Sequence, residues 1–157
     1  MYYTTFQSNL GEIIIAAHDG GLTHIAFQDG AQPVQPQPGW QLDEEPFKEA
    51  IQQLTEYFNG QRKTFNLNLA PKGTAFQTKV WSLLQEIPFG KVISYGQLAE
   101  QAGNPRASRA VGAANGRNPL PVVIPCHRVI GGNGKLTGYA GGLAIKEKLL
   151  QLEQVKL

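Results

Sequence analysis

The sequence predicts an α+β protein made of two parts, residues 1–71 and residues 72–157. In the first part, short segments of alternating apolar and polar side chains are separated by glycine-containing turns, which is typical of a small antiparallel sheet. In the second part, apolar residues recur at helical spacing behind two capping signals. We therefore expect an N-terminal α+β scaffold domain, with a small sheet and a helix, and a mainly helical C-terminal domain that contains a helix-turn-helix.

The formal charge divides between the same two parts. Residues 1–71 carry three Lys or Arg and eight Asp or Glu, a net charge of −5, whereas residues 72–157 carry eleven and four, a net charge of +7. A basic part of this kind favours contact with a polyanion such as nucleic acid. A solvated surface is the alternative, and charge alone does not decide between the two.

Three strands are expected near the start of the chain, over residues 2–6, 12–17 and 22–27, because turn residues separate them. A helix should follow and end at Gly60. Its apolar face consists of Phe47, Ala50, Ile51, Leu54, Tyr57 and Phe58. Residues 65–69 alternate apolar and polar side chains, which suits one more strand. Since these elements carry no chemistry that the sequence identifies, we expect this part to act as a scaffold.

Helices dominate the second part. Two capping boxes, Thr74 with Gln77 and Ser94 with Gln97, each precede an apolar helical pattern. A Gly-Asn-Pro break then separates the second helix from a third over about 106–114. Two short helices joined by a glycine-containing turn form a helix-turn-helix candidate.

The third helix consists mostly of small residues, and Arg106 and Arg109 are its only long side chains. A helix that reads base sequence normally presents Asn, Gln, Arg or Lys repeatedly to the major groove. Small residues instead allow close approach of the helix backbone, which predicts docking on DNA without base specificity. An Ala-rich helix packed inside a core is the alternative.

The sole cysteine, Cys126, lies between a short apolar run and a glycine turn, and we place the chemistry there. A thiol is a good nucleophile only as thiolate, so neighbouring groups should lower a pKa that starts near ~8.5. His127 and Arg128 can supply a proton acceptor and a positive charge. In an extended strand adjacent side chains point to opposite faces, so coupling of His127 to the sulfur would need a turn or a bridging water. The alternative is that Cys126 is a small buried core residue.

The last helical pattern places a carboxylate on an apolar stripe, because Ile145, Leu149 and Glu153 are spaced at i, i+4 and i+8. An anion near a helix C-terminus is unfavourable, and burial makes it more so unless a donor is supplied. His127 is the candidate donor. The alternative is a frayed, solvated terminal turn. Just before this helix, the glycine-rich segment 138–142 can bring backbone N–H groups close to a ligand.

Metal sites and membrane segments are not expected. One cysteine and three histidines show no zinc-ligand spacing, and no disulfide can form within the chain. The N-terminus lacks a basic segment followed by an apolar stretch, and no apolar run approaches the ~20 residues that span a bilayer. A free functional thiol without an export signal favours the reducing cytoplasm.

Taken together, these features resemble the O6-alkylguanine-DNA alkyltransferases, the methylated-DNA–protein-cysteine methyltransferase family. The similarity covers about residues 74–153. It is carried by Pro125-Cys126-His127-Arg128, Asn118 eight residues before the cysteine, Ser94-Tyr95, Arg109 and residues 139–142. In residues 1–71 the resemblance is limited to the order of the elements.

The resemblance implies DNA repair by direct reversal. The protein would bind duplex DNA, flip an O6-alkylguanine out of the stack and transfer the alkyl group irreversibly to Cys126, in a single stoichiometric turnover. Arg109 would enter the stack where the base leaves, while the helix over 106–114 docks in the minor groove. O6-methylguanine would be the main substrate, with O4-methylthymine as a further candidate. No cofactor is implied, and a monomer is expected.

The resemblance also implies roles for single residues. Glu153 would orient His127, which through a water withdraws the proton of Cys126. Asn118 would tie the DNA-binding helices to the active-site segment, and Tyr95 would hold the nucleotide and donate to guanine N3. The implied DNA-binding residues are Arg106, Arg109, Ala110, Ser94 and Tyr95. The implied substrate-pocket residues are Val129, Tyr139, Ala140 and Gly141.

Three other functions are considered. A DNA-binding relative that flags lesions without repairing them would lack the cysteine, so Cys126 argues against it. A cysteine hydrolase with Cys126, His127 and Glu153 as a triad would turn over repeatedly. A transcriptional regulator would show strong sequence preference, which the small-residue helix disfavours.

Overall fold

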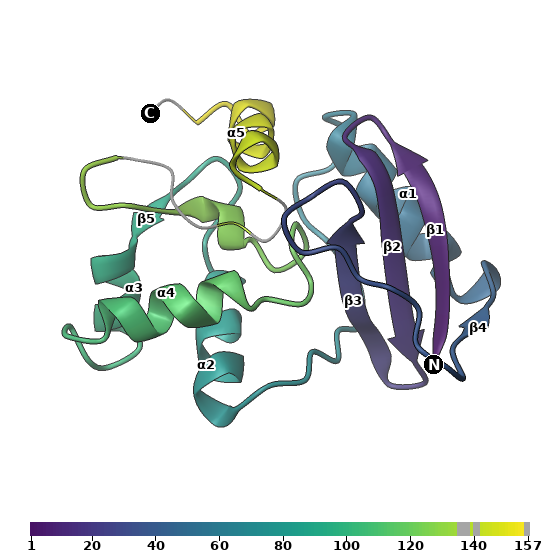
Figure 1. Ribbon diagram of the computed structural model, residues 1–157. Coiled ribbons are helices and arrows are strands. Elements are labelled where there is room, and N and C mark those ends of the chain that lie inside the picture. Colours follow the sequence, from purple (N-terminus) through teal and green to yellow (C-terminus); the bar gives the residue numbers. More distant parts are fainter. Residues whose placement is uncertain (135–138, 140–141, 156–157) are drawn as a thin grey trace.

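The computed structural model describes residues 1–134, 139 and 142–155. A sheet with its covering helix forms one side of the molecule, and a group of helices forms the other (Figure 1). No helix in these ranges is long and apolar enough to span a membrane.

The N-terminal sheet contains four strands within the described residues, in the order β3-β2-β1-β4. They are β1 (Tyr2–Ser8), β2 (Gly11–His18), β3 (Gly21–Phe27) and β4 (Gln41–Leu42). β2 pairs antiparallel with both β1 and β3, whereas the short β4 lies parallel to β1. The predicted small antiparallel sheet is therefore confirmed, with β4 as an added edge strand.

Helix α1 (Lys48–Phe58) follows the short 3-10 helix η1 (Glu45–Phe47) and packs on the sheet (Figure 1). The strand expected over residues 65–69 does not form. The segment makes only an isolated β-bridge, between Leu69 and Leu22. The reason lies in a side chain of α1. Gln53 donates to the Asn66 carbonyl at 3.1 Å and accepts from the Asn66 N–H at 2.9 Å, so these backbone groups do not pair with a strand.

The C-terminal part is mainly helical, as expected. Its elements are α2 (Ala75–Leu84), β5 (Ile93–Ser94), α3 (Tyr95–Gln101), α4 (Ser108–Gly116), the 3-10 helix η2 (Cys126–Arg128), β6 (Val129–Ile130) and α5 (Leu143–Leu152). Both predicted capping boxes are present, at Thr74 and at Ser94. The short parallel pair β5–β6 joins Ile93 to Val129 and so places η2 close to the start of α3.

Helix α4 begins later and ends later than the sequence pattern indicated. Asn104 holds the preceding turn, because its side chain accepts from the Arg106 N–H at 3.0 Å and its carbonyl accepts from the Ala107 N–H at 2.9 Å. Arg106 therefore belongs to the turn between α3 and α4. The helix continues through Asn115 and Gly116, the residues expected to follow it.

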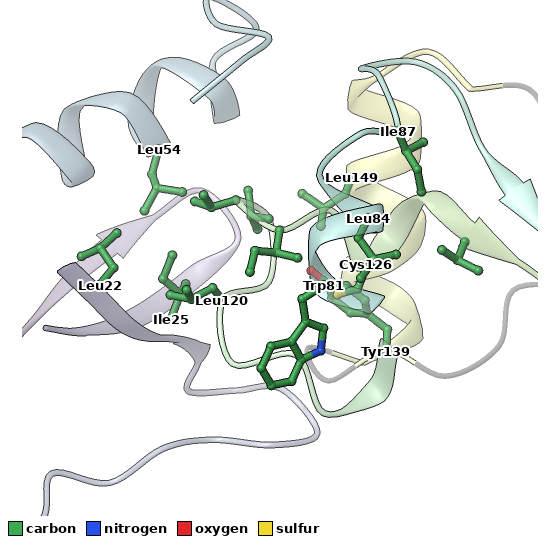
Figure 2. Close-up of a cluster of buried hydrophobic side chains, with 14 of the residues drawn as sticks. Leu22, Ile25, Leu54, Trp81, Leu84, Ile87, Leu120, Cys126, Tyr139 and Leu149 are labelled. Atoms are coloured by element: carbon green, nitrogen blue, oxygen red, sulfur yellow. The ribbon is translucent and has the colours of Figure 1, made fainter. Parts of the chain in front are cut away.

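One hydrophobic core joins the two parts of the molecule (Figure 2). Ile25 and Leu54 from the first part belong to the same buried cluster as Leu120, Leu149 and Cys126 from the second. A backbone hydrogen bond of 2.8 Å from the Ile25 N–H to the Pro119 carbonyl also links them. The N-terminal part is thus packed directly against the segment that leads to the cysteine.

Candidate active site

Cys126 begins the 3-10 helix η2 and is almost completely buried, with 1% of its surface exposed. The turn is closed by a 3.0 Å hydrogen bond from the Arg128 N–H to the Pro125 carbonyl. Figure 2 places the sulfur among the core side chains near Leu84 and Tyr139. Sequence analysis indicated that coupling of His127 to the sulfur needs a turn or a bridging water, and a turn is present at this position.

Burial raises the pKa of the Cys126 thiol to about 11, although a hydrogen bond from Asn118 and the positive charge of Lys146 act in the opposite direction. The expectation of a lowered thiol pKa is therefore wrong for this arrangement. The side chains of His127 and Arg128 are directed to Glu153, and almost none of the Cys126 surface is exposed to solvent. A proton acceptor is consequently needed to generate the thiolate.

Glu153 lies at the centre of a buried polar cluster. Its Oε2 accepts from His127 Nε2 at 2.6 Å, Tyr57 Oη at 2.5 Å and Arg128 Nη2 at 3.0 Å. Its Oε1 accepts from Arg128 Nε at 2.8 Å and from the Gly90 N–H at 3.1 Å. Burial alone would raise the pKa of Glu153, but the hydrogen bonds from His127 and Arg128 outweigh it and hold that pKa well below its usual range. The carboxylate is thus a fixed anion rather than a frayed terminal residue.

His127 is fully buried between the cysteine segment and this carboxylate. Burial lowers its pKa, which outweighs the opposing effect of Glu153, so the ring is neutral at physiological pH. With Nε2 bonded to Glu153, the tautomer assigned by this contact carries its proton on Nε2. His127 Nδ1 has no hydrogen-bond partner among the described residues, so its lone pair is available to accept a proton.

Two asparagines tie the end of α4 to the cysteine segment. Asn118 Nδ2 donates to the Ile124 carbonyl at 2.8 Å, while its Oδ1 accepts from the Leu120 N–H at 2.9 Å. Asn115 Nδ2 donates to the Cys126 carbonyl at 3.3 Å. Asn118 was predicted to link helices and active site, whereas Asn115 was not, because it followed the predicted end of the helix.

The residues expected to bind DNA lie around α3 and α4. Arg106, Arg109 and Ala110 are exposed, whereas Ser94 and Tyr95 are half-buried at the start of α3. The opposite side of α4 buries Val111, Ala114 and Asn115. Sequence analysis left open whether this helix docks on DNA or packs in the core. One face of α4 packs in the core, and the opposite face is exposed and open to a partner.

The substrate-pocket residues are only partly described. Val129 and Tyr139 are buried, and the Tyr139 hydroxyl has no hydrogen-bond partner among the described residues. Ala140 and Gly141 lie outside the described residues. Lys146, which sequence analysis did not select, is fully buried and donates to the Val129 carbonyl at 2.7 Å. The sequence pattern around Lys146 on α5 did not indicate its hydrogen bond to the Val129 carbonyl.

No group of three or more His, Cys, Asp or Glu side chains within the described ranges could hold a metal ion. The polar groups near Cys126 include a neutral imidazole, a carboxylate that orients it, amide donors and the ammonium group of Lys146. These groups can position and deprotonate a thiol. Together with the exposed arginine-bearing face of α4, they define a protein that couples a cysteine nucleophile to a helix-turn-helix.

Comparison with known proteins identifies the family. The family model for the 6-O-methylguanine DNA methyltransferase DNA-binding domain matches residues 75–155. The model for the ribonuclease-like domain of the same methyltransferases matches residues 1–71. A methylated-DNA–protein-cysteine methyltransferase of Methanosarcina acetivorans is 52% identical over 153 residues, which cover 98% of both chains. The constitutive enzyme of Bacillus subtilis is 48% identical over 98% of this chain and 96% of its own.

A solved structure agrees with these matches. The Mycobacterium tuberculosis OGT in complex with DNA superimposes with a TM-score of 0.91 at 43% identity, covering 98% of this chain and 93% of that one. The chain belongs to the methylated-DNA–protein-cysteine methyltransferase family, as the resemblance in its sequence indicated.

Proposed function

We propose that this protein repairs O6-alkylguanine in duplex DNA by direct reversal and that Cys126 receives the alkyl group. The observation that carries the proposal is the arrangement around the only cysteine, with its neighbour His127 held by Glu153 and open at Nδ1. Family membership over the full chain supports it, as does the complex of the Mycobacterium tuberculosis relative with DNA.

The transfer is a nucleophilic displacement at the alkyl carbon. The proton of Cys126 passes through a bridging water to His127 Nδ1, and the sulfur forms a bond to the carbon as the carbon–O6 bond breaks. The electron pair of that bond stays with guanine, which Tyr95 assists by donating to ring nitrogen N3. Asn118 holds the cysteine segment against the helices during this step. The product is a thioether, which water does not cleave, so each molecule repairs one lesion.

DNA recognition is assigned to α4 and to the start of α3. In this proposal the small-residue face of α4 docks in the minor groove, and Arg106, Ala110, Ser94 and Tyr95 contact the duplex. Arg109 occupies the space of the extruded nucleotide. Val129, Tyr139, Ala140 and Gly141 line the pocket that receives the base.

The finer points of the proposal concern substrate, organisation and location. O6-methylguanine is the main substrate and O4-methylthymine a further one. Residues 1–71 form a scaffold domain, and residues 72–157 form the DNA-binding and active-site domain. The protein functions in the cytoplasm, where reducing conditions keep Cys126 as a free thiol.

A titration tests this function. Duplex DNA that carries one O6-methylguanine is added in increasing amounts to a fixed amount of protein, and restored guanine is quantified. The proposal predicts a plateau at one repaired base per protein molecule. Repair that continues beyond this plateau indicates a turnover enzyme such as a hydrolase, and binding without repair indicates a lesion-flagging protein. Either outcome would overturn the proposal.

A further inference from the structure

Tyr57 connects the N-terminal part of the protein to the candidate active site. It lies on α1, 96 residues before Glu153, and its hydroxyl donates to Glu153 Oε2 at 2.5 Å. Both side chains are buried, with 0% and 2% of their surfaces exposed. The sequence motifs of the active site do not include this tyrosine, and its helical pattern indicated only a core position.

The hydroxyl of Tyr57 and the imidazole of His127 share one acceptor atom. Oε2 of Glu153 receives Tyr57 Oη at 2.5 Å and His127 Nε2 at 2.6 Å, with Arg128 Nη2 further away at 3.0 Å. Each donor withdraws negative charge from that oxygen. Tyr57 therefore affects how strongly Glu153 can polarise His127, and its position limits where Oε2 can lie.

The ring of Tyr57 is held by other aromatic rings. Its centroid lies 5.6 Å from Phe58, 5.4 Å from Phe65 and 6.2 Å from Phe89, and the contact with Phe89 is edge-on at 83°. The Arg128 guanidinium lies 5.9 Å from the centroid of Phe89. Two of the donors to Glu153, Tyr57 and Arg128, are thus held by one aromatic cluster, which keeps the hydroxyl aimed at the carboxylate.

We propose that Tyr57 is a positioning residue for alkyl transfer, which fixes Glu153 Oε2 and draws charge from it so that His127 is oriented without becoming strongly basic. The inference rests on the proposed function, because it assigns His127 as the acceptor of the thiol proton. A neutral His127 accepts that proton, whereas a protonated one cannot. Tyr57 would thereby extend the pH range over which the protein reacts toward the acidic side.

Other ionisable groups around His127 also affect its protonation. Glu153, just after α5, raises the pKa of His127, whereas the charges of Arg128 and Lys146 lower it. Tyr57 on α1 shares the acceptor Glu153 Oε2, and Tyr139 interacts with Cys126 and Glu153. Burial and the negative charge of Glu153 raise the pKa of Tyr57, so its hydroxyl keeps its proton and stays a donor. A change confined to the Tyr57 hydroxyl leaves the other groups in place.

The test is the variant Tyr57→Phe, which removes the hydroxyl and keeps the ring. The second-order rate of alkyl transfer to Cys126 is measured against pH, and the His127 imidazole is titrated by NMR in the same samples. We expect the acidic limb of the profile and the imidazole titration to shift upward together by about half a unit, which slows transfer about threefold on the acidic side. At neutral pH, where His127 is already unprotonated, the rate should fall less than it does on the acidic side.

Tyr3→Phe is the matched control, because it removes a tyrosine hydroxyl on β1, outside the aromatic cluster around Tyr57. It should leave both titrations in place. The inference is overturned if Tyr57→Phe lowers stability or rate equally at all pH values while the His127 titration stays unchanged. Failure of the proposed function is a separate result, because in that case the wild-type protein itself acquires no alkyl group.

Discussion

His127 Nε2 and Glu153 Oε2 lie 2.6 Å apart in the interior of the protein, although 26 residues separate them in the chain. The contact joins the 3-10 turn that carries the cysteine to the C-terminal end of α5. It leaves His127 Nδ1 as the available proton acceptor, and it determines several measurable properties.

Glu153→Gln should slow alkyl transfer by roughly 10²-fold, because an amide cannot stabilise the imidazolium that forms when His127 takes the thiol proton. The rate is measured per folded molecule, with the folded fraction taken from circular dichroism. Glu147→Gln, an exposed position on the same helix, is the control and should react like the wild type. A folded Glu153→Gln protein with an unchanged rate would remove Glu153 from the mechanism.

Acid should destabilise the protein in two stages. The pKa of His127 is lowered on folding, so the unfolded chain binds more protons and stability falls below about pH 6.5. The pKa of Glu153 is also lowered, so a second loss begins below about pH 4.3. Urea unfolding measured from neutral to acidic pH checks both stages. Glu153→Gln should be less stable than the wild type at neutral pH, and it should lose less stability below about pH 4.3 because it lacks the carboxylate. The same pH dependence of stability in Glu153→Gln and in the wild type would contradict this.

Arg109→Ala should slow repair of duplex DNA by roughly tenfold or more, because extrusion of a base costs a few kcal/mol and the side chain no longer fills the space left behind. Reaction with free O6-benzylguanine should change little, since no base has to be extruded. Lys48→Ala, an exposed substitution on α1, controls for the loss of one positive charge. Equal slowing on both substrates would exclude a role for Arg109 in base flipping.

Asn118→Ala should destabilise the protein by about 1–3 kcal/mol, because the Ile124 carbonyl and the Leu120 N–H each lose a buried partner. Transfer should also slow, since the cysteine segment is no longer tied to the end of α4. Urea unfolding and the transfer rate report the two effects. Asn68→Ala, at an exposed position, is the control. Wild-type stability in Asn118→Ala would show that these hydrogen bonds contribute little.

Local patterns were sufficient to predict much of the molecule. The capping residues at Thr74 and Ser94 predicted two helix starts, and the apolar stripe that ends at Glu153 predicted its contact with His127. The helix starts and the burial of Glu153 depend on residues a few positions apart, so spacing along the chain determines them. The need of a buried carboxylate for a hydrogen-bond donor then indicated His127.

The remaining features depend on contacts between distant segments. Gln53 bonds the backbone of Asn66 and prevents the expected strand, and Tyr57 reaches Glu153 from the other part of the chain. The pKa of Cys126 is raised by burial, whereas sequence neighbours suggested the opposite. Burial and partner choice arise from tertiary packing, which the spacing of residues does not specify.

The most direct test of the account is to locate the transferred group. Protein that has reacted with methylated duplex DNA is analysed by intact mass and then by peptide mass spectrometry, alongside Cys126→Ala. The account predicts a gain of one CH₂ unit, confined to the peptide that contains Cys126, while Cys126→Ala binds the DNA and gains nothing. A methyl group on another residue, or restored guanine with no change in protein mass, would contradict it.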